Sequence, residues 1–206
     1  IEPVFFVAYL PCPWYNIHSS HERMIPMKFM IASALHGSAY YTRQLLDAFA
    51  REGADRLILL GDLLYHGPRN DLPAGYEPKK VISLLNEYKD IIFAVRGNCD
   101  TEVDQMVLEF SLLNDFIPFY IDGISFIASH GHIYNADRPV AKAEKIYLCG
   151  HTHIPAKEDH NGIMYLNQGS VALPKDNTRY SYMVYENRRF TWKDLHTGER
   201  YMEYLI

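Results

Sequence analysis

Apolar runs and helical patterns alternate in the first half of the chain. Short apolar runs bounded by glycine, proline or polar residues have the length and composition of buried strands. Between them, apolar residues recur at the spacing of one helix face. We expect strands at 28–33, 56–60 and 91–95, and helices at 40–51 and 78–88. This alternation predicts βαβ units that share a parallel sheet.

After a short predicted helix at 102–110, the pattern changes to strands with tight turns. Asp122-Gly123 separates two apolar runs and has the composition of a β-hairpin turn. Strands are expected at 119–121, 124–128, 145–149, around Lys157, and at 164–167, 170–173, 180–185, 189–195 and 200–205, mostly as an antiparallel meander. The chain therefore predicts an α/β fold of two packed mixed β-sheets flanked by helices.

Residues 1–26 share no helix or strand periodicity with the rest of the chain. We expect a leader there, non-native or poorly ordered, followed by one domain at 27–206. One interpretation is translated non-coding sequence upstream of a start at Met27, since Glu22-Arg23 is compatible with a purine-rich stretch that resembles a ribosome-binding site. The alternative is a native extension whose aromatic residues pack on a neighbour. We favour the first.

Composition limits the classes of partner. A hydrophobic fraction of 48% and a charged fraction of 22% over 206 residues are ordinary for a globular protein. The net charge is −5 and no long basic run occurs, which argues against a nucleic-acid groove. The apolar stretch 4–10 is too short to span a bilayer and lacks the basic start of a signal peptide. The three cysteines form no CxxC pair and suit a reducing compartment, so we expect a cytoplasmic protein.

Short polar clusters follow several of the predicted strands. Loop tips converge beyond the carboxyl ends of strands in α/β sheets, so these clusters are expected to meet. Carboxylates, amides and imidazoles gathered in this way suit a pair of divalent metal ions. Each cluster alone is also compatible with a turn, a capping acid or a structural histidine. The clusters are Gly61-Asp62, Gly97-Asn98-Cys99-Asp100, Ser129-His130-Gly131-His132 and Gly150-His151-Thr152-His153.

Taken in this order, the clusters resemble the calcineurin-like metallophosphoesterase superfamily and, within it, the small bacterial and archaeal phosphodiesterases. That family has the pattern DxH, GD, GNxD, HGH and GHTH. The similarity extends to His66-Gly67-Pro68-Arg69-Asn70 and Asn167-Gln168-Gly169-Ser170, and covers the chain from Met27 onwards. It implies a four-layer sandwich that hydrolyses phosphodiester bonds of a small molecule with a hydroxide held between two metal ions.

The resemblance also implies the ligands. One ion would be held by His36, Asp62 and His153. The other would be held by Asp62, Asn98, His130 and His151, with Asp62 shared. Oxygen and imidazole donors suit two divalent ions, of which Mn is expected first and Zn, Fe or Ni are alternatives.

Two positions depart from the family pattern. Cys99 stands where phosphomonoesterase relatives often have a histidine that protonates the leaving group, which predicts a preference for activated diesters. His132 or His66 is a candidate substitute, and Arg69 is either a phosphate clamp or a solvated loop residue. Ala34 stands where the family has a metal-binding Asp, so the ion at His36 and His153 should bind weakly and catalysis should be impaired. Ala34 is either an engineered change, a sequence error or clone variant, or natural decay; the other intact ligands favour a single change.

The leading function is therefore a metal-dependent phosphodiesterase that acts on a small phosphate ester. The alternative is a non-catalytic protein-interaction scaffold with a degraded site, for which the retromer subunit of this fold is the precedent. A nuclease is a third option, but it would need a basic groove. No membrane partner is expected, and the aromatic-rich C-terminal strands suit a homo-oligomer surface.

Overall fold

The computed structural model describes residues 27–140 and 145–206, so the predicted leader at 1–26 lies outside it. The elements are β1 (Phe29–Ala32), α1 (Ala39–Glu52), β2 (Arg56–Leu59), α2 (Pro78–Asn86), a 3-10 turn (Lys89–Ile91), β3 (Ile92–Ala94), α3 (Glu102–Gln105), β4 (Phe116–Ile121), β5 (Ile124–Ser129), β6 (Ile146–Cys149), β7 (Pro155–His160), β8 (Ile163–Gln168), β9 (Ser181–Glu186), β10 (Arg189–Asp194) and β11 (Arg200–Leu205). None of the helices in the described part combines the length and apolar character needed to cross a membrane.

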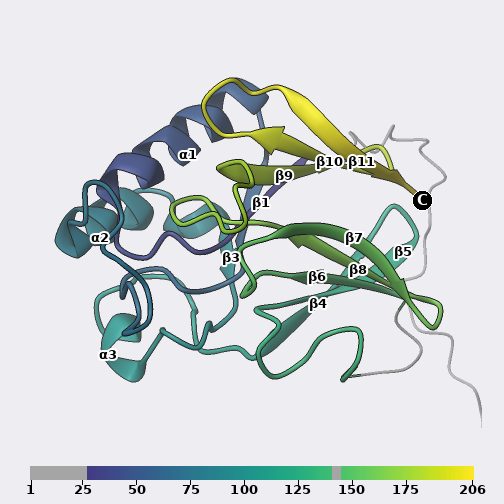
Figure 1. The fold of residues 1–206 in the computed structure, drawn as a ribbon, viewed down its shortest axis with the longest axis horizontal. Coiled ribbons are helices and arrows are strands. Elements are labelled where there is room, and N and C mark those ends of the chain that lie inside the picture. Colours follow the sequence, from purple (N-terminus) through teal and green to yellow (C-terminus); the bar gives the residue numbers. More distant parts are fainter. Residues whose placement is uncertain (1–26, 141–144) are drawn as a thin grey trace, which may run out of the picture.

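The first sheet has the strand order β11-β10-β9-β1-β2-β3. Its strands β1, β2 and β3 are parallel neighbours, as the alternating pattern predicted, and β9 pairs antiparallel with β1. Helices α1 and α2 cover the outer face of this sheet (Figure 1). The Ser38 side chain accepts a hydrogen bond from the Tyr41 amide at the start of α1, and Gly53 ends the helix in the left-handed region.

The C-terminal end of α1 is tied to the first sheet by Glu52. Its carboxylate accepts hydrogen bonds from Lys193 Nζ at 2.6 Å, the Tyr182 hydroxyl at 2.9 Å and Lys28 Nζ at 3.2 Å. Burial opposes ionisation of this carboxylate, but these three donors hold the pKa of Glu52 below its usual value.

The second sheet has the order β4-β5-β6-β8-β7 and packs face to face with the first (Figure 1). Large side chains from both sheets fill the space between them, with Trp192, Tyr185, Phe190 and Phe126 fully buried. The outer face of the second sheet is covered in the described part by the loop after β5, where Ala136 joins a small apolar cluster with Tyr147.

The predicted fold of two mixed sheets packed face to face is confirmed, with local differences. The second half is not a single meander, because β9, β10 and β11 return to the first sheet and β6 lies parallel between β5 and β8. Residues 170–173 do not form a strand; the Val171 and Ala172 amides donate to the Ser33 and Ala34 carbonyls after β1 instead. The helix predicted at 102–110 ends at Gln105, whose side chain binds the backbone of the following irregular segment.

Candidate metal centre

Loops after five strands bring the predicted ligands together at one edge of the two sheets. The residues are His36 after β1, Asp62 after β2, Asn98 after β3, His130 after β5, and His151 and His153 after β6. Four of them have left-handed backbone, with φ of 45° at His36, 57° at Asp62, 66° at His151 and 63° at His153. Such conformations cost about 1–3 kcal/mol each for residues other than glycine and concentrate at functional sites.

His36 and His153 form the first pair. Their Nε2 atoms lie 3.1 Å apart. His36 Nδ1 donates to the Tyr65 carbonyl at 2.8 Å, and His153 Nδ1 donates to the Leu173 carbonyl at 2.7 Å. A carbonyl only accepts, so both Nδ1 atoms carry hydrogen and both Nε2 atoms present a lone pair when the rings are neutral.

The charge state of this pair follows from its burial. Burial, followed by repulsion from His36, lowers the pKa of His153 to about 4, and burial also lowers the pKa of His36. Two neutral rings therefore aim lone pairs at each other across 3.1 Å. A cation placed between the two nitrogens would relieve this contact, and nitrogens that each lie about 2.0–2.1 Å from one ion come this close.

His130 is the centre of the second cluster. Its Nδ1 donates to the Leu60 carbonyl at 2.6 Å, which turns Nε2 towards the remaining ligands. Nε2 lies 3.1 Å from Asn98 Oδ1 and 3.2 Å from His151 Nδ1. Burial disfavours a charged ring here, but the Asp62 carboxylate raises the pKa of His130 above its usual value. This cluster also has the donor set of a site for a cation.

Asp62 lies between the two clusters. Its Oδ2 is 3.6 Å from His36 Nε2 and 3.4 Å from His130 Nε2, and its Oδ1 accepts the Cys99 amide at 2.9 Å. Burial favours the neutral acid, but His130 and His36 hold the pKa of Asp62 well below its usual range. One oxygen of an ionised carboxylate thus faces both clusters, as a ligand shared by two ions would.

Asp100 holds the loops that carry Asp62 and Asn98. Its buried carboxylate accepts the amides of Asp62 at 2.7 Å, Leu63 at 2.8 Å and Gly97 at 2.7 Å. Burial and the nearby Asp62 charge raise the pKa of Asp100 to about 6. A side chain at Gly97 would collide with Asp62, which explains the glycine. The motif contained Asp100, but its positioning role was not predicted.

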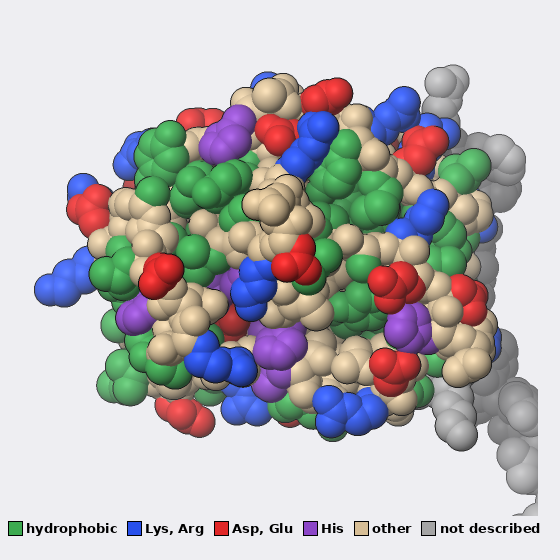
Figure 2. Space-filling model, viewed as in Figure 1, with side chains coloured by type: hydrophobic (Ala, Val, Ile, Leu, Met, Phe, Trp, Pro, Cys, Tyr) green, Lys and Arg blue, Asp and Glu red, His purple; other side chains and the backbone are tan. Residues whose placement is uncertain are grey.

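A cavity of about 670 Å³ opens over this centre. Asp62, Asn98, His151 and His153 line it together with Arg69. The space-filling view shows histidine side chains near the middle of one face, with lysine and arginine beside them (Figure 2).

Lys175 also lines the cavity, and the sequence reading missed it. Its amide donates to the His153 carbonyl at 3.3 Å. It follows the irregular segment after β8, which was expected to be a strand, and no local motif marks it. Arg69 and Lys175 together give the cavity two cationic side chains that suit an anionic ligand.

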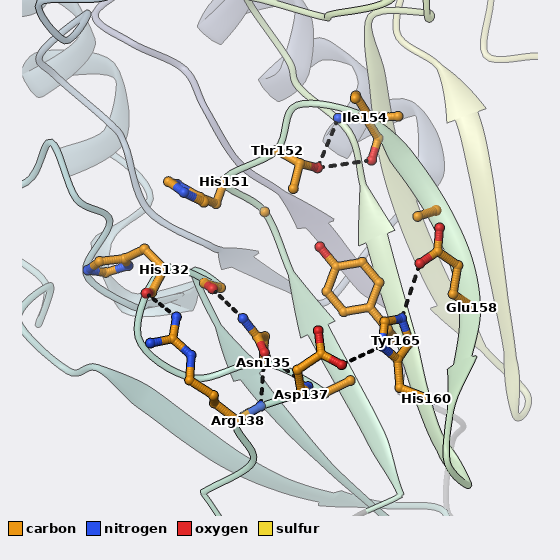
Figure 3. A pocket seen from close by; sticks show the side chains of 14 residues that line it. His132, Asn135, Asp137, Arg138, His151, Thr152, Ile154, Glu158, His160 and Tyr165 are labelled. Carbon is orange, nitrogen blue, oxygen red and sulfur yellow. Dashed lines mark hydrogen bonds and ion pairs between the residues drawn. The ribbon is translucent and has the colours of Figure 1, made fainter.

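The other predicted histidines lie differently. His132 and His151 line a neighbouring pocket of about 450 Å³ (Figure 3). Burial lowers the pKa of His132 to about 4. His66 packs edge-on against the Tyr65 and Tyr76 rings and does not line the main cavity.

Both departures from the family pattern are buried. Cys99 is 7% exposed, and burial followed by the Asp62 and Asp100 charges raises the pKa of its thiol to about 12. Ala34 is fully buried with φ of 58°. Its amide donates to the Gly61 carbonyl at 3.0 Å, so it lies beside the loop that carries Asp62.

Comparison with known proteins agrees with this arrangement. Residues 27–189 match the calcineurin-like phosphoesterase superfamily domain. The chain is 42% identical to phosphodiesterase YfcE of Escherichia coli K12 over 162 residues, which cover 78% of this chain and 88% of YfcE. A solved structure of YfcE matches with a TM-score of 0.83 and 38% identity, covering 87% of this chain and 100% of that chain.

A more distant relative is phosphodiesterase MJ0936 of Methanocaldococcus jannaschii. It is 23% identical over 154 residues, which cover 69% of this chain and 83% of MJ0936. The predicted family and its fold are therefore confirmed by both sequence and structure. On the strength of the matched domain and the similarity to YfcE, this chain belongs to the calcineurin-like phosphoesterase superfamily.

Proposed function

We propose that this chain is a metal-dependent phosphodiesterase that acts on a small molecule, impaired by Ala34. The observation that carries the proposal is the convergence of two imidazole clusters on one oxygen of Asp62. His36, His153 and Asp62 would hold one divalent ion. Asp62, Asn98, His130 and His151 would hold the other, with manganese the expected metal.

When bound, the ions would activate the attacking water and offset the charge that develops on the phosphate oxygens. The chain's own residues would bind and orient the substrate. Arg69 and Lys175 line the same cavity and would bind a phosphate oxygen or orient the anion. The cavity of about 670 Å³ suits a small-molecule ester.

The leaving group would receive little help from this chain. His132, with its pKa lowered to about 4, is a neutral imidazole at neutral pH and lacks the acidic proton of an imidazolium. The Cys99 thiol, with its pKa raised to about 12, is a poor acid at that pH. Diesters whose alcohol leaves readily as an anion should therefore react best, as the sequence predicted.

Ala34 would impair the enzyme at its first metal position. A methyl group supplies neither a donor atom nor a negative charge to the ion at His36 and His153. Loss of a residue that merely supports a ligand typically costs 10–100-fold in metal affinity, so loss of a ligand should cost at least as much. The proposal therefore includes unequal occupancy of the two positions.

The similarity to named phosphodiesterases favours this function over the interaction scaffold. The net charge of −5 likewise favours a small ester over a nucleic acid, because phosphate backbones need extended basic surfaces.

Hydrolysis of bis(p-nitrophenyl) phosphate with added Mn²⁺ tests the proposal. The unchanged chain should show slow, chelator-sensitive turnover that rises in Ala34→Asp. His130→Gln should abolish this turnover in the Ala34→Asp background. His160→Gln is the matched control, because His160 lies outside the centre and pairs with the exposed Asp137 and Glu158. Metal binding without turnover in Ala34→Asp would contradict the proposed function.

A further inference from the structure

We propose that Cys99 replaces the missing carboxylate as a ligand of the ion held by His36 and His153, so that this position binds zinc in preference to manganese. The inference rests on the proposed metal centre, but it concerns which metal binds and not whether the enzyme turns over. The proposal gives one metal position a sulfur ligand, whereas the neighbouring position has only nitrogen and oxygen ligands.

The first argument is the distance between donor atoms. One ligand atom each of His36, Asp62 and Cys99 lie within 4.8 Å of one another. His153 Nε2 is a further 3.1 Å from His36 Nε2. These three donors and His153 would together supply four ligands, and four is the coordination number that zinc prefers.

The second argument is independent of the cysteine. The His36 side chain is fully buried, and its Nε2 faces His153 Nε2 with no hydrogen between them when both rings are neutral. Two buried lone pairs aimed into one space favour a cation there. The Cys99 thiol therefore lies near two imidazole nitrogens that could already hold an ion.

The third argument is the softness of sulfur. Thiolate ligands select zinc or copper(I), whereas manganese prefers oxygen donors. The second position has Asp62, Asn98, His130 and His151, which supply only nitrogen and oxygen. We therefore expect one position that takes zinc through sulfur and one that accepts manganese.

Binding requires the Cys99 thiol to lose its proton. Without a metal the thiol stays protonated, because burial, followed by the Asp62 and Asp100 charges, raises its pKa to about 12. A divalent ion reverses this local charge, and a coordinating thiol is deprotonated outright. The balance is one sulfur–metal bond formed and one S–H bond broken, with the proton released to solvent.

X-ray absorption at the zinc edge tests the inference directly. The full chain carries Cys12→Ser, so that no cysteine from residues 1–26 can contribute, and it is loaded with two equivalents of Zn²⁺. We expect a sulfur shell at about 2.3 Å in addition to nitrogen and oxygen at about 2.0–2.1 Å. Zinc bound with nitrogen and oxygen alone would overturn the inference and leave the proposed function standing. Failure to bind both Zn²⁺ and Mn²⁺ would refute the proposed function as well.

Variants give a second readout with Co²⁺, whose thiolate complexes absorb in the near ultraviolet. Cys99→Ala should remove this band and weaken zinc binding at least about tenfold, with a smaller effect on manganese. Cys149→Ala is the matched control, because Cys149 is also a buried free cysteine but contacts Ser129. Ala34→Asp should also weaken the band, since the restored carboxylate takes the place of sulfur. A band that persists in Cys99→Ala, or disappears in Cys149→Ala alone, would overturn the assignment.

Discussion

Replacing Ala34 with aspartate should change stability in opposite directions with and without metal. Ala34 is fully buried and hydrogen-bonded to Gly61, the residue before Asp62. A second carboxylate there lacks a counter-charge in the presence of a chelator, so the variant should unfold at a lower temperature than the unchanged chain. With Mn²⁺, the same carboxylate becomes a ligand and the order should reverse.

The size of the metal effect follows from the expected affinity. If the restored ligand strengthens binding about 100-fold, the bound form gains about 2.8 kcal/mol at 1.4 kcal/mol per tenfold. When free Mn²⁺ exceeds both dissociation constants, this gain appears as extra stability. For a chain of this size, each kcal/mol raises Tm by about 2–4 °C, so the metal-induced rise should be larger in the variant by roughly 6–11 °C.

Differential scanning calorimetry in the presence of a chelator and of Mn²⁺ measures the change in Tm under each condition. Ala34→Asn is the matched control, because asparagine has the same shape and tolerates the left-handed backbone at φ of 58° but carries no charge. The reasoning is refuted if Ala34→Asp and Ala34→Asn respond equally to Mn²⁺.

Three further predictions concern positioning, pH and substrate. Asp100→Asn should lower the free energy of unfolding by about 3 kcal/mol, because an amide cannot accept all three buried N–H groups. Asp104→Asn at the start of α3 is the control and should cost about 1 kcal/mol or less. Urea denaturation tests both variants. Glu52→Gln should cost about 2–3 kcal/mol at pH 7. Because the pKa of Glu52 is lowered in the folded state, the difference should begin to shrink near the usual pKa of a glutamate and be lost as pH falls through the lower folded-state pKa. An unchanged difference in acid would contradict this, and Glu109→Gln, which removes an exposed pair with Lys89, is the control. In the Ala34→Asp background, kcat for aryl phosphodiesters should fall steeply as the pKa of the leaving group rises, and His132→Gln should leave that slope unchanged; a shallow slope would indicate a proton donor.

The strands that carry the centre were predictable because their signals are local. Each of β1, β2 and β3 is a short, mostly buried run followed by polar residues, and strand order alone brings such residues to one edge. The assignment of later strands to sheets was less predictable, since antiparallel runs such as β9 look alike whichever sheet they join.

Other parts of the centre depend on contacts between distant segments. Lys175 reaches the cavity through an irregular segment that bonds to the loop after β6. The hydrogen positions on His36 and His153 depend on the carbonyls of Tyr65 and Leu173, which no motif marks. These contacts fix the tautomers of His36 and His153 and bring the charge of Lys175 to the cavity. The sequence therefore predicted which residues meet, but not the contacts that hold them in place.

Anomalous diffraction at the manganese edge, from crystals of the unchanged chain grown with Mn²⁺, tests the two-metal account most directly. The account predicts a strong peak among Asp62, Asn98, His130 and His151. It predicts a clearly weaker peak, or none, between His36 and His153. Two peaks of equal height would contradict the role assigned to Ala34, and the absence of any peak would contradict the metal centre itself.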